Sequence, residues 1–138
     1  MYSPLKHFGA GNGGKRVGIV GMGGLGQMGV RLAIALGNKV TAISTSPNKR
    51  NSVMELGIDD FIVSTDFKEM NKAARSLDII LNTISADHQC GKFLSLLTTN
   101  GTLVQLGFVI EPQKVGVPSM FMKTVLILKE ENQVWNLY

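Results

Sequence analysis

Short apolar runs rich in β-branched residues alternate along the chain with longer segments of helical period. The runs show little alternation of apolar and polar positions, which is typical of strands covered on both faces of a parallel sheet. After the first run, residues 16–20, a stripe at helical spacing consists of Leu25, Met28, Gly29, Leu32 and Leu36. The alternation predicts repeated βαβ units, and the apolar stripe predicts the buried face of the first helix.

The predicted elements cover most of the chain. The expected strands are residues 16–20, 39–43, 61–63, 77–82, 102–106 and 125–128, and the expected helices are residues 25–36, 47–57, 67–75 and 89–97. Strands that alternate with helices in this way form a parallel sheet with helices on both faces. The sequence therefore predicts an α/β fold, a Rossmann-type doubly wound parallel sheet of five or six strands in three layers.

Length and composition fit a single globular domain. The 138 residues are 44% hydrophobic and 17% charged, so the chain has enough apolar surface for one core and little room for a second domain. We expect residues 1–14 to form a truncated helix and a glycine-rich connector, 15–128 the sheet domain, and 129–138 a divergent polar tail. The net charge of +4 is too diffuse to indicate a nucleic-acid partner.

Glycine is enriched, at 16 of 138 residues, and one glycine cluster carries the clearest motif. Residues 21–26 have the G-x-G-x-x-G pattern and stand between the first predicted strand and the first predicted helix. There the first glycine permits a tight turn, the second lets a pyrophosphate approach the backbone, and the third lets helix and strand pack closely. The predicted dinucleotide-binding residues are Gly21, Met22, Gly23, Gly24, Leu25 and Gly26. A glycine-rich turn that binds nothing is the alternative.

The residues after the second predicted strand favour NADP(H) over NAD(H). An NAD site places Asp or Glu about 20 residues into the unit, but no carboxylate occurs here before Glu55. Hydroxyls and cations, which suit a ribose 2′-phosphate, stand there instead: Ser44, Thr45, Ser46, Lys49 and Arg50. The alternative is structural, with Ser46 capping the next helix and both cations in its solvated first turn.

Two residues at further strand ends are candidates for contacts with the nicotinamide half of the cofactor. Thr83 follows the fourth predicted strand and Gly107 the fifth, and doubly wound sheets bind ligands at the carboxyl ends of their strands. Plain turn residues are the alternative interpretation of both. We find no set of residues that would exchange the substrate proton during hydride transfer, so no catalytic residue is predicted.

The remaining chemically capable side chains have structural interpretations. We expect His7 and His88 to be surface or capping residues, Cys90 to be a small buried residue, and Asp59-Asp60 to mark a turn. No metal site is predicted in this chain. A single cysteine, the absence of an apolar run of membrane-spanning length and a start unlike a signal peptide favour the cytoplasm.

Five segments together are similar to a known family: residues 2–8, 18–29, 40–46, 55–60 and 78–83. They resemble the cofactor-binding domain of the cinnamyl alcohol dehydrogenase branch of the zinc-dependent, medium-chain alcohol dehydrogenases. The resemblance runs from residue 2 to about residue 127 without a large gap. It implies reversible, NADP-dependent reduction of an aldehyde to a primary alcohol, with a catalytic zinc that polarises the carbonyl oxygen.

The resemblance also implies roles for individual residues. It places the phosphate loop at residues 21–26, the 2′-phosphate contacts at Ser44, Thr45 and Lys49, and the nicotinamide contacts at Thr83 and Gly107. The implied substrate is a small aldehyde or alcohol. The implied assembly is a homodimer through the sheet edge near Val125, where an unpaired apolar strand would find a partner.

The chain departs from that family in two regions. The family's zinc-binding catalytic domain lies mostly N-terminal to the matched segment, and Cys90 matches none of its metal ligands. Residues 129–138 do not resemble the family's nicotinamide-contacting loop. Zinc is therefore expected only in the absent catalytic domain, and we expect this chain alone to be inactive. A free-standing dinucleotide-binding or redox-sensing module, and an inactive fragment that associates through an exposed apolar face, are the alternatives.

Overall fold

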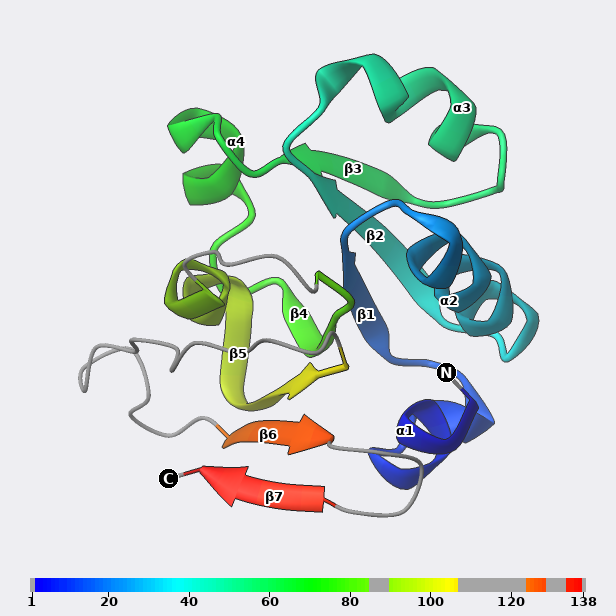
Figure 1. The fold of residues 1–138 in the computed structure, drawn as a ribbon, viewed down its shortest axis with the longest axis vertical. Helices are drawn as coiled ribbons and strands as arrows, with labels where there is room; N and C mark the ends of the chain where they lie inside the picture. The colour runs from blue at the N-terminus through cyan, green and yellow to red at the C-terminus, as the bar shows by residue number, and fades with distance from the viewer. Residues whose placement is uncertain (1, 85–89, 107–123, 129–133, 138) are drawn as a thin grey trace.

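The computed structural model describes residues 2–84, 90–106, 124–128 and 134–137 (Figure 1). The helices are α1 (Tyr2–His7), η1 (Ala10–Asn12), α2 (Gly24–Ala35), η2 (Pro47–Lys49), α3 (Arg50–Met54), α4 (Phe67–Lys72) and η3 (Cys90–Leu96). The strands are β1 (Arg16–Val20), β2 (Lys39–Ser44), β3 (Asp60–Val63), β4 (Leu77–Asn82), β5 (Leu97–Gln105), β6 (Thr124–Leu128) and β7 (Val134–Leu137). Among the described helices, none has the length and apolar character needed to cross a membrane.

The strands form one sheet in the order β3-β2-β1-β4-β5-β6-β7. Strands β1 to β6 run parallel to one another, and β7 pairs antiparallel with β6. The chain first adds strands on one side of β1 and then returns to add β4 on the other side. The predicted Rossmann-type doubly wound sheet is therefore confirmed, and its switch point lies at the carboxyl ends of β1 and β4.

Helices cover both faces of this sheet (Figure 1). On one face, Ile19 of β1 belongs to a core cluster with Val30 of α2 and Val53 of α3. On the other face, Val20 of β1 belongs to a second cluster, which includes Met70 of α4 and residues of η3. Successive strand residues point to opposite faces, so each of the strands β1 to β5 contributes to both clusters. The two cores give the three layers predicted from the sequence.

The buried face of α2 agrees only in part with the predicted one: Gly29 is buried and Leu32 and Leu36 pack partly buried against the core. The buried residues of α2 are Gly26, Gly29, Val30 and Ala33. Leu25 and Met28, predicted to be buried, are 44% and 61% exposed. Both stripes have helical spacing, so periodicity does not choose between them. Close packing does, because a Cβ at position 26 would lie 1.7 Å from the Gly21 carbonyl oxygen, and only a stripe of small residues lets the helix approach so closely.

The second half of the chain differs from prediction in three places. Residues 90–96 form the 3-10 helix η3 instead of an α-helix, and β5 begins already at Leu97. The pair Asn100-Gly101, which is typical of a turn, lies inside β5, with Asn100 at φ 65°. The sequence therefore predicts that the strand begins after this pair, whereas it begins before it. The strand β7 lies within the predicted polar tail and pairs with β6, so the prediction of an unpaired edge near Val125 is wrong. The homodimer itself stays a prediction.

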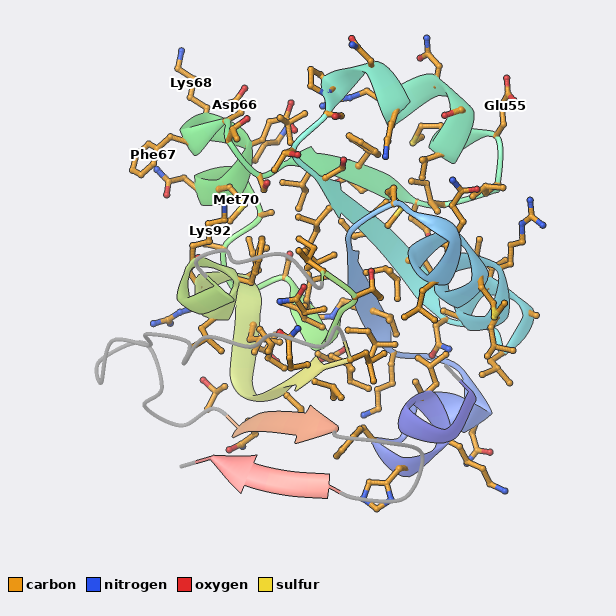
Figure 2. All side chains as sticks on the ribbon, in the orientation of Figure 1. Glu55, Asp66, Phe67, Lys68, Met70 and Lys92 are labelled. Atoms are coloured by element: carbon orange, nitrogen blue, oxygen red, sulfur yellow. The ribbon has the colours of Figure 1, made fainter. Side chains whose placement is uncertain are left out.

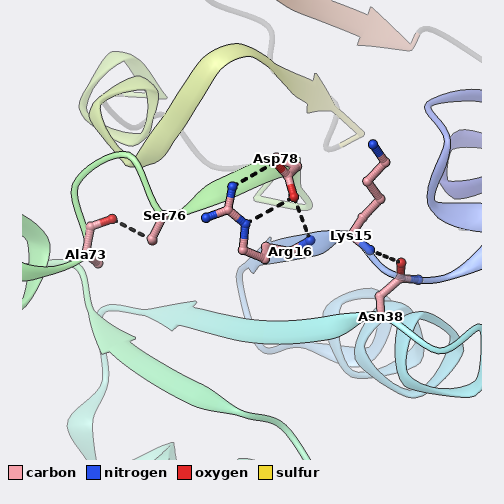
Figure 3. Close-up of polar contacts among 6 residues, drawn as sticks. All are labelled: Lys15, Arg16, Asn38, Ala73, Ser76 and Asp78. Carbon is pink, nitrogen blue, oxygen red and sulfur yellow. Dashed lines mark hydrogen bonds and ion pairs between the residues drawn. The ribbon is translucent and has the colours of Figure 1, made fainter.

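An ion pair joins β1 and β4 at their amino ends, the opposite end from the switch point (Figure 3). Arg16 Nη2 lies 3.0 Å from Asp78 Oδ1, and Asp78 Oδ2 accepts hydrogen bonds from Arg16 Nε at 3.2 Å and from the Arg16 backbone N–H at 2.9 Å. These side-chain hydrogen bonds from Arg16 hold the pKa of Asp78 below its ordinary value. The Asp78 carboxylate is therefore favoured in the folded protein.

We expect Asp78→Asn to lower the free energy of unfolding by about 1 kcal/mol at neutral pH, a modest value because both side chains are partly exposed. A lowered folded-state pKa stabilises the protein above the ordinary carboxyl value of 3.8, and this stabilisation is lost as the pH falls through the folded-state value. Urea denaturation should therefore show the variant and the unmodified chain converging in acid. A difference that stays constant with pH would contradict this role of the carboxylate.

Candidate functional site

The loop between β1 and α2 lies at the switch point and carries the predicted phosphate-binding glycines. Gly21 has a φ of +90°, and a Cβ there would lie 2.8 Å from the Thr83 hydroxyl oxygen. A Cβ at Gly26 would lie 1.7 Å from the Gly21 carbonyl oxygen. The packing of the protein itself therefore requires glycine at both positions.

Gly23 and Gly24 have no such internal requirement. Apart from the adjoining residues and the backbone of α2 itself, no atom of the described residues lies within 4 Å of a Cβ built on either glycine. Gly23 is extended, with φ −79° and ψ −164°, and directly precedes α2, a helix of 12 residues with no acidic side chain in its first turn. A helix N-terminus presents backbone N–H groups without intrahelical partners and the positive end of the helix dipole. The open space over Gly23 is therefore a cradle that suits a phosphate group.

The apolar residues of the loop, Met22 and Leu25, have different surroundings. Met22 is 3% exposed and belongs to the core cluster around α2, so its side chain anchors the loop. Gln27 strengthens this anchor because its side-chain amide donates to the Met22 carbonyl oxygen at 3.2 Å. Leu25 is largely exposed at the start of α2. A ligand over the cradle would thus meet the Leu25 side chain but only the backbone of Met22.

Thr83 follows β4 and lies directly beside the phosphate loop. Its backbone N–H and its hydroxyl both donate to the Val20 carbonyl oxygen, at 3.0 and 2.7 Å. The hydroxyl also lies 3.3 Å from the Gly21 carbonyl oxygen. Thr83 therefore holds the turn that opens the loop. Its predicted nicotinamide contact stays a prediction, and Gly107 lies outside the described residues.

A buried pair of amide side chains joins the carboxyl ends of β4 and β5. Asn82 donates from Nδ2 to Gln105 Oε1 at 2.8 Å, and its Oδ1 accepts from the Ile84 N–H at 3.2 Å. Gln105 in turn donates to the Ile84 carbonyl oxygen at 3.1 Å. Both side chains are almost fully buried, so a broken hydrogen bond would leave a costly unsatisfied polar group. The pair therefore fixes the path of the chain beyond Thr83.

Asn82 and Gln105 are not among the site residues predicted from the sequence. Neither residue belongs to a motif with a fixed spacing. The available signal was that each is a polar residue at the carboxyl end of a predicted apolar strand. In a doubly wound sheet that position borders the ligand crevice.

The hydroxyl turn, residues 44–49, begins beside the phosphate loop. The Gly21 N–H donates to the Ile43 carbonyl oxygen at 2.9 Å, which joins the end of β2 to the loop. Ser44 is buried, and its Oγ accepts a hydrogen bond from the Ser46 N–H at 3.1 Å. The Lys49 N–H donates to the Ser46 carbonyl oxygen at 3.2 Å, which closes the turn.

The structure places the predicted 2′-phosphate residues along this turn without the capping bond of the alternative interpretation. Ser46 occupies the N-cap position of η2, but its side chain makes no capping hydrogen bond. The side chains of Thr45 and Lys49 are exposed. Arg50, by contrast, places Nη2 at 2.6 Å from Glu69 Oε1. The two adjacent cations, which spacing alone does not distinguish, therefore have different surroundings.

The other candidate side chains lie apart from this edge of the sheet or have structural partners. His7 is exposed on α1 and contacts the Phe8 ring edge-on, at 4.7 Å between ring centroids. Asp59 accepts a hydrogen bond from the Val40 N–H and Asp60 from the Phe61 N–H, both at 2.8 Å. His88 lies outside the described residues, as does the side chain of Cys90. Among the described residues, no group of three His, Cys, Asp or Glu side chains is placed to hold a metal ion.

Comparison with known proteins identifies relatives of this chain. The profile of the zinc-binding dehydrogenase family matches residues 24–132. A probable cinnamyl alcohol dehydrogenase 2 from Picea abies is 47% identical over 123 residues, which are 88% of this chain and 34% of the relative. A probable cinnamyl alcohol dehydrogenase from Populus deltoides is 45% identical over the same shares of the two chains. The chain thus spans about a third of the length of these curated relatives.

Two solved structures share the fold and a substantial part of the sequence. A cinnamyl alcohol dehydrogenase (SbCAD4) from Sorghum bicolor is 41% identical, with a TM-score of 0.86 over 90% of this chain and 36% of the other. CAD from Helicobacter pylori, solved in complex with NADP(H), is 30% identical, with a TM-score of 0.76 over 91% of this chain and 36% of the other.

Proposed function

The chain belongs to the zinc-binding dehydrogenase family, and from that premise we propose that it binds NADP(H) as the cofactor unit of an alcohol dehydrogenase. The resemblance to the cinnamyl alcohol dehydrogenase branch is confirmed by the relatives of 45% to 47% identity. The observation that carries the proposal is the open cradle at Gly23 and Gly24. Gly21 and Gly26 are needed for the packing of the protein itself, whereas Gly23 and Gly24, which lie between them, are not. A pyrophosphate bound at the loop would explain why these two positions are also glycine.

The residues of the chain would hold the cofactor at three places along the switch point. The backbone N–H groups of Gly23, Gly24 and Leu25, at the N-terminus of α2, would bind the pyrophosphate. The hydroxyl turn would receive the adenosine ribose. Thr83 keeps the phosphate loop in position from the side where the nicotinamide would lie. When bound, the nicotinamide ring supplies the hydride acceptor or donor for the reaction.

The hydroxyl turn supports NADP(H) over NAD(H). Thr45 and Lys49 are exposed, and the turn offers hydroxyls and a cation where an NAD site would place a carboxylate. We assign Lys49 to the 2′-phosphate because Arg50 is engaged by Glu69. The complex of the Helicobacter pylori protein with NADP(H) supports the same choice of cofactor.

We further propose that the reaction of the whole enzyme is the reversible reduction of an aldehyde to a primary alcohol. The names of the curated relatives support this substrate class. The described residues provide no metal-ligand group, so no step through zinc is assigned to this chain. The sequence contains a single cysteine, which supports a reducing, cytoplasmic location.

Titration calorimetry and an activity assay together test the proposal. The chain should bind NADPH in a one-to-one complex, and NADH more weakly, because NADH lacks the 2′-phosphate. It should reduce cinnamaldehyde no faster than background, with or without added zinc. Absence of NADPH binding would overturn the cofactor assignment, and turnover by the chain would overturn the assignment of catalysis to other residues.

A further inference from the structure

An ion pair crosses the outer edge of the sheet next to the hydroxyl turn. Glu69 of α4 accepts from Arg50 Nη2 on Oε1 at 2.6 Å, and from the Val63 backbone N–H on Oε2 at 2.7 Å. The Arg50 guanidinium also lies over the Phe61 ring, 5.3 Å from its centroid. We call Arg50, Glu69 and the Val63 N–H the edge clamp.

The edge clamp is possible because β3 is the last strand of the sheet on this side. Ser64, just beyond β3, donates its N–H inward to the Ser44 carbonyl oxygen at 2.9 Å. The N–H groups of a strand alternate in direction, so the Val63 N–H points outward, away from β2. The Glu69 carboxylate takes the place of a further strand there, and its other oxygen remains available to Arg50.

The edge clamp also joins the two helical layers. Arg50 begins α3, which packs with Val53 in one core, whereas Glu69 lies in α4, which packs with Met70 in the other. Asp66 fixes the first turn of α4, because its carboxylate accepts from the backbone N–H groups of Lys68 and Glu69 at 2.9 and 3.3 Å. Glu69 is therefore held on its own helix as well as by its two partners.

The hydroxyl turn is held at one end by a hydrogen bond of the sheet and at the other end by the edge clamp. Its first residue, Ser44, is bound to the chain just after β3 through the Ser64 N–H, and its last residue, Lys49, directly precedes Arg50. Ser52 additionally donates its hydroxyl to the Lys49 carbonyl oxygen at 3.0 Å. Both ends of the turn are thus held in a fixed position relative to β3. Loss of the clamp would release the end that carries Lys49.

We propose that Glu69 is a positioning residue for the discrimination of NADP(H) from NAD(H). This proposal rests on the proposed function, since it requires the 2′-phosphate to lie at the hydroxyl turn. Glu69 holds Arg50, and Arg50 holds Lys49 and the neighbouring hydroxyls in place. Sequence reasoning missed Glu69 because it stands in a different helix, 19 residues after Arg50.

The competing interpretation, that Arg50 binds the 2′-phosphate directly, predicts the opposite effect of one substitution. Glu69→Gln removes the ion pair while keeping the size of the side chain. If Arg50 were a phosphate ligand restrained by Glu69, the substitution would release it and raise the affinity for NADPH. If the edge clamp positions Lys49, the same substitution lowers that affinity.

The test compares the NADPH and NADH affinities of Glu69→Gln, Arg50→Met and the double variant by calorimetry, with circular dichroism to confirm folding. We expect the NADPH to NADH affinity ratio to fall about 5- to 10-fold in each single variant, the scale of one ion-pair contact, and no further in the double variant. Arg50→Lys should restore most of the ratio. A merely structural role would lower both affinities together and leave the ratio unchanged.

Glu55→Gln is the matched control, because it changes the net charge equally and Glu55 points away from the body of the protein at the end of α3 (Figure 2). Its ratio should equal that of the unmodified chain. If the NADPH to NADH affinity ratio of Glu69→Gln is preserved or raised, the positioning role of Glu69 is wrong, while the proposed function is unaffected. Equal affinities in the unmodified chain would overturn both the NADP(H) preference and the clamp. If Glu69→Gln does not fold, Glu69→Asp, which draws the carboxylate back from Arg50, is measured in its place, and a raised ratio in that variant would overturn the edge clamp.

Discussion

Gly23→Val is expected to abolish binding of both NADPH and NADH while the protein keeps its fold. The valine side chain would extend into the open space over the N-terminus of α2, where a Cβ at position 23 has no described atom within 4 Å apart from its chain neighbours. The extended backbone of Gly23 suits a β-branched residue, so we expect a cost of only about 1 kcal/mol from the weaker helix cap.

The expected loss of affinity for each cofactor is at least about 100-fold, since two or more charge-assisted hydrogen bonds to the phosphates would be lost. Calorimetry measures the loss, and circular dichroism with thermal unfolding checks the fold. Gly26→Ala is the informative contrast, because its Cβ would lie 1.7 Å from the Gly21 carbonyl oxygen. That variant should lose about 3 kcal/mol of stability. If a folded Gly23→Val variant still binds the cofactors, the phosphates do not bind over Gly23, and the proposed cradle is wrong.

Lys49→Glu is expected to erase most of the preference for NADPH over NADH. The substitution replaces an exposed cation at the end of the hydroxyl turn with an anion that repels the 2′-phosphate. We expect the affinity for NADPH to fall by about 1 to 3 kcal/mol, which is roughly 5- to 150-fold. The affinity for NADH should change little, because NADH carries no phosphate at this position.

The control for Lys49→Glu is Lys39→Glu, which makes the same change of charge at the amino end of β2, the opposite end of the sheet from the hydroxyl turn. A general electrostatic effect would move both variants alike. An unchanged NADPH preference in Lys49→Glu, or an equal loss in Lys39→Glu, would contradict the assignment of Lys49.

The topology and the phosphate loop were predictable because they depend on local patterns. Apolar runs, helical periods and the glycine spacing each lie within one stretch of chain, and all indicate the same doubly wound sheet. The buried face of α2 was not predictable from periodicity. The stripe of Gly26, Gly29, Val30 and Ala33 competes with a more apolar stripe of the same period, and it is favoured by a contact with Gly21 that exists only in the folded chain.

The parts of the site that escaped prediction depend on contacts between distant segments. Thr83 is identified by its strand-end position, but the direction of its hydroxyl toward Val20 follows from the pairing of β1 with β4. Arg50 and Lys49 are equivalent by spacing, and the resemblance alone favours Lys49; the physical difference between them is that Glu69 reaches Arg50 at the edge of β3. Position at a strand end can be read from a pattern, whereas the partner of a side chain requires the fold.

The most direct test of the central claim is a two-dimensional amide NMR titration of the chain with NADPH. We expect the largest shifts at the amides of Gly23, Gly24 and Leu25, and at the hydroxyl turn. Titration with NADH should reproduce the shifts of these three loop amides and leave those of the hydroxyl turn much smaller. Saturable binding whose shifts lie elsewhere, or no shifts at all, would contradict the account.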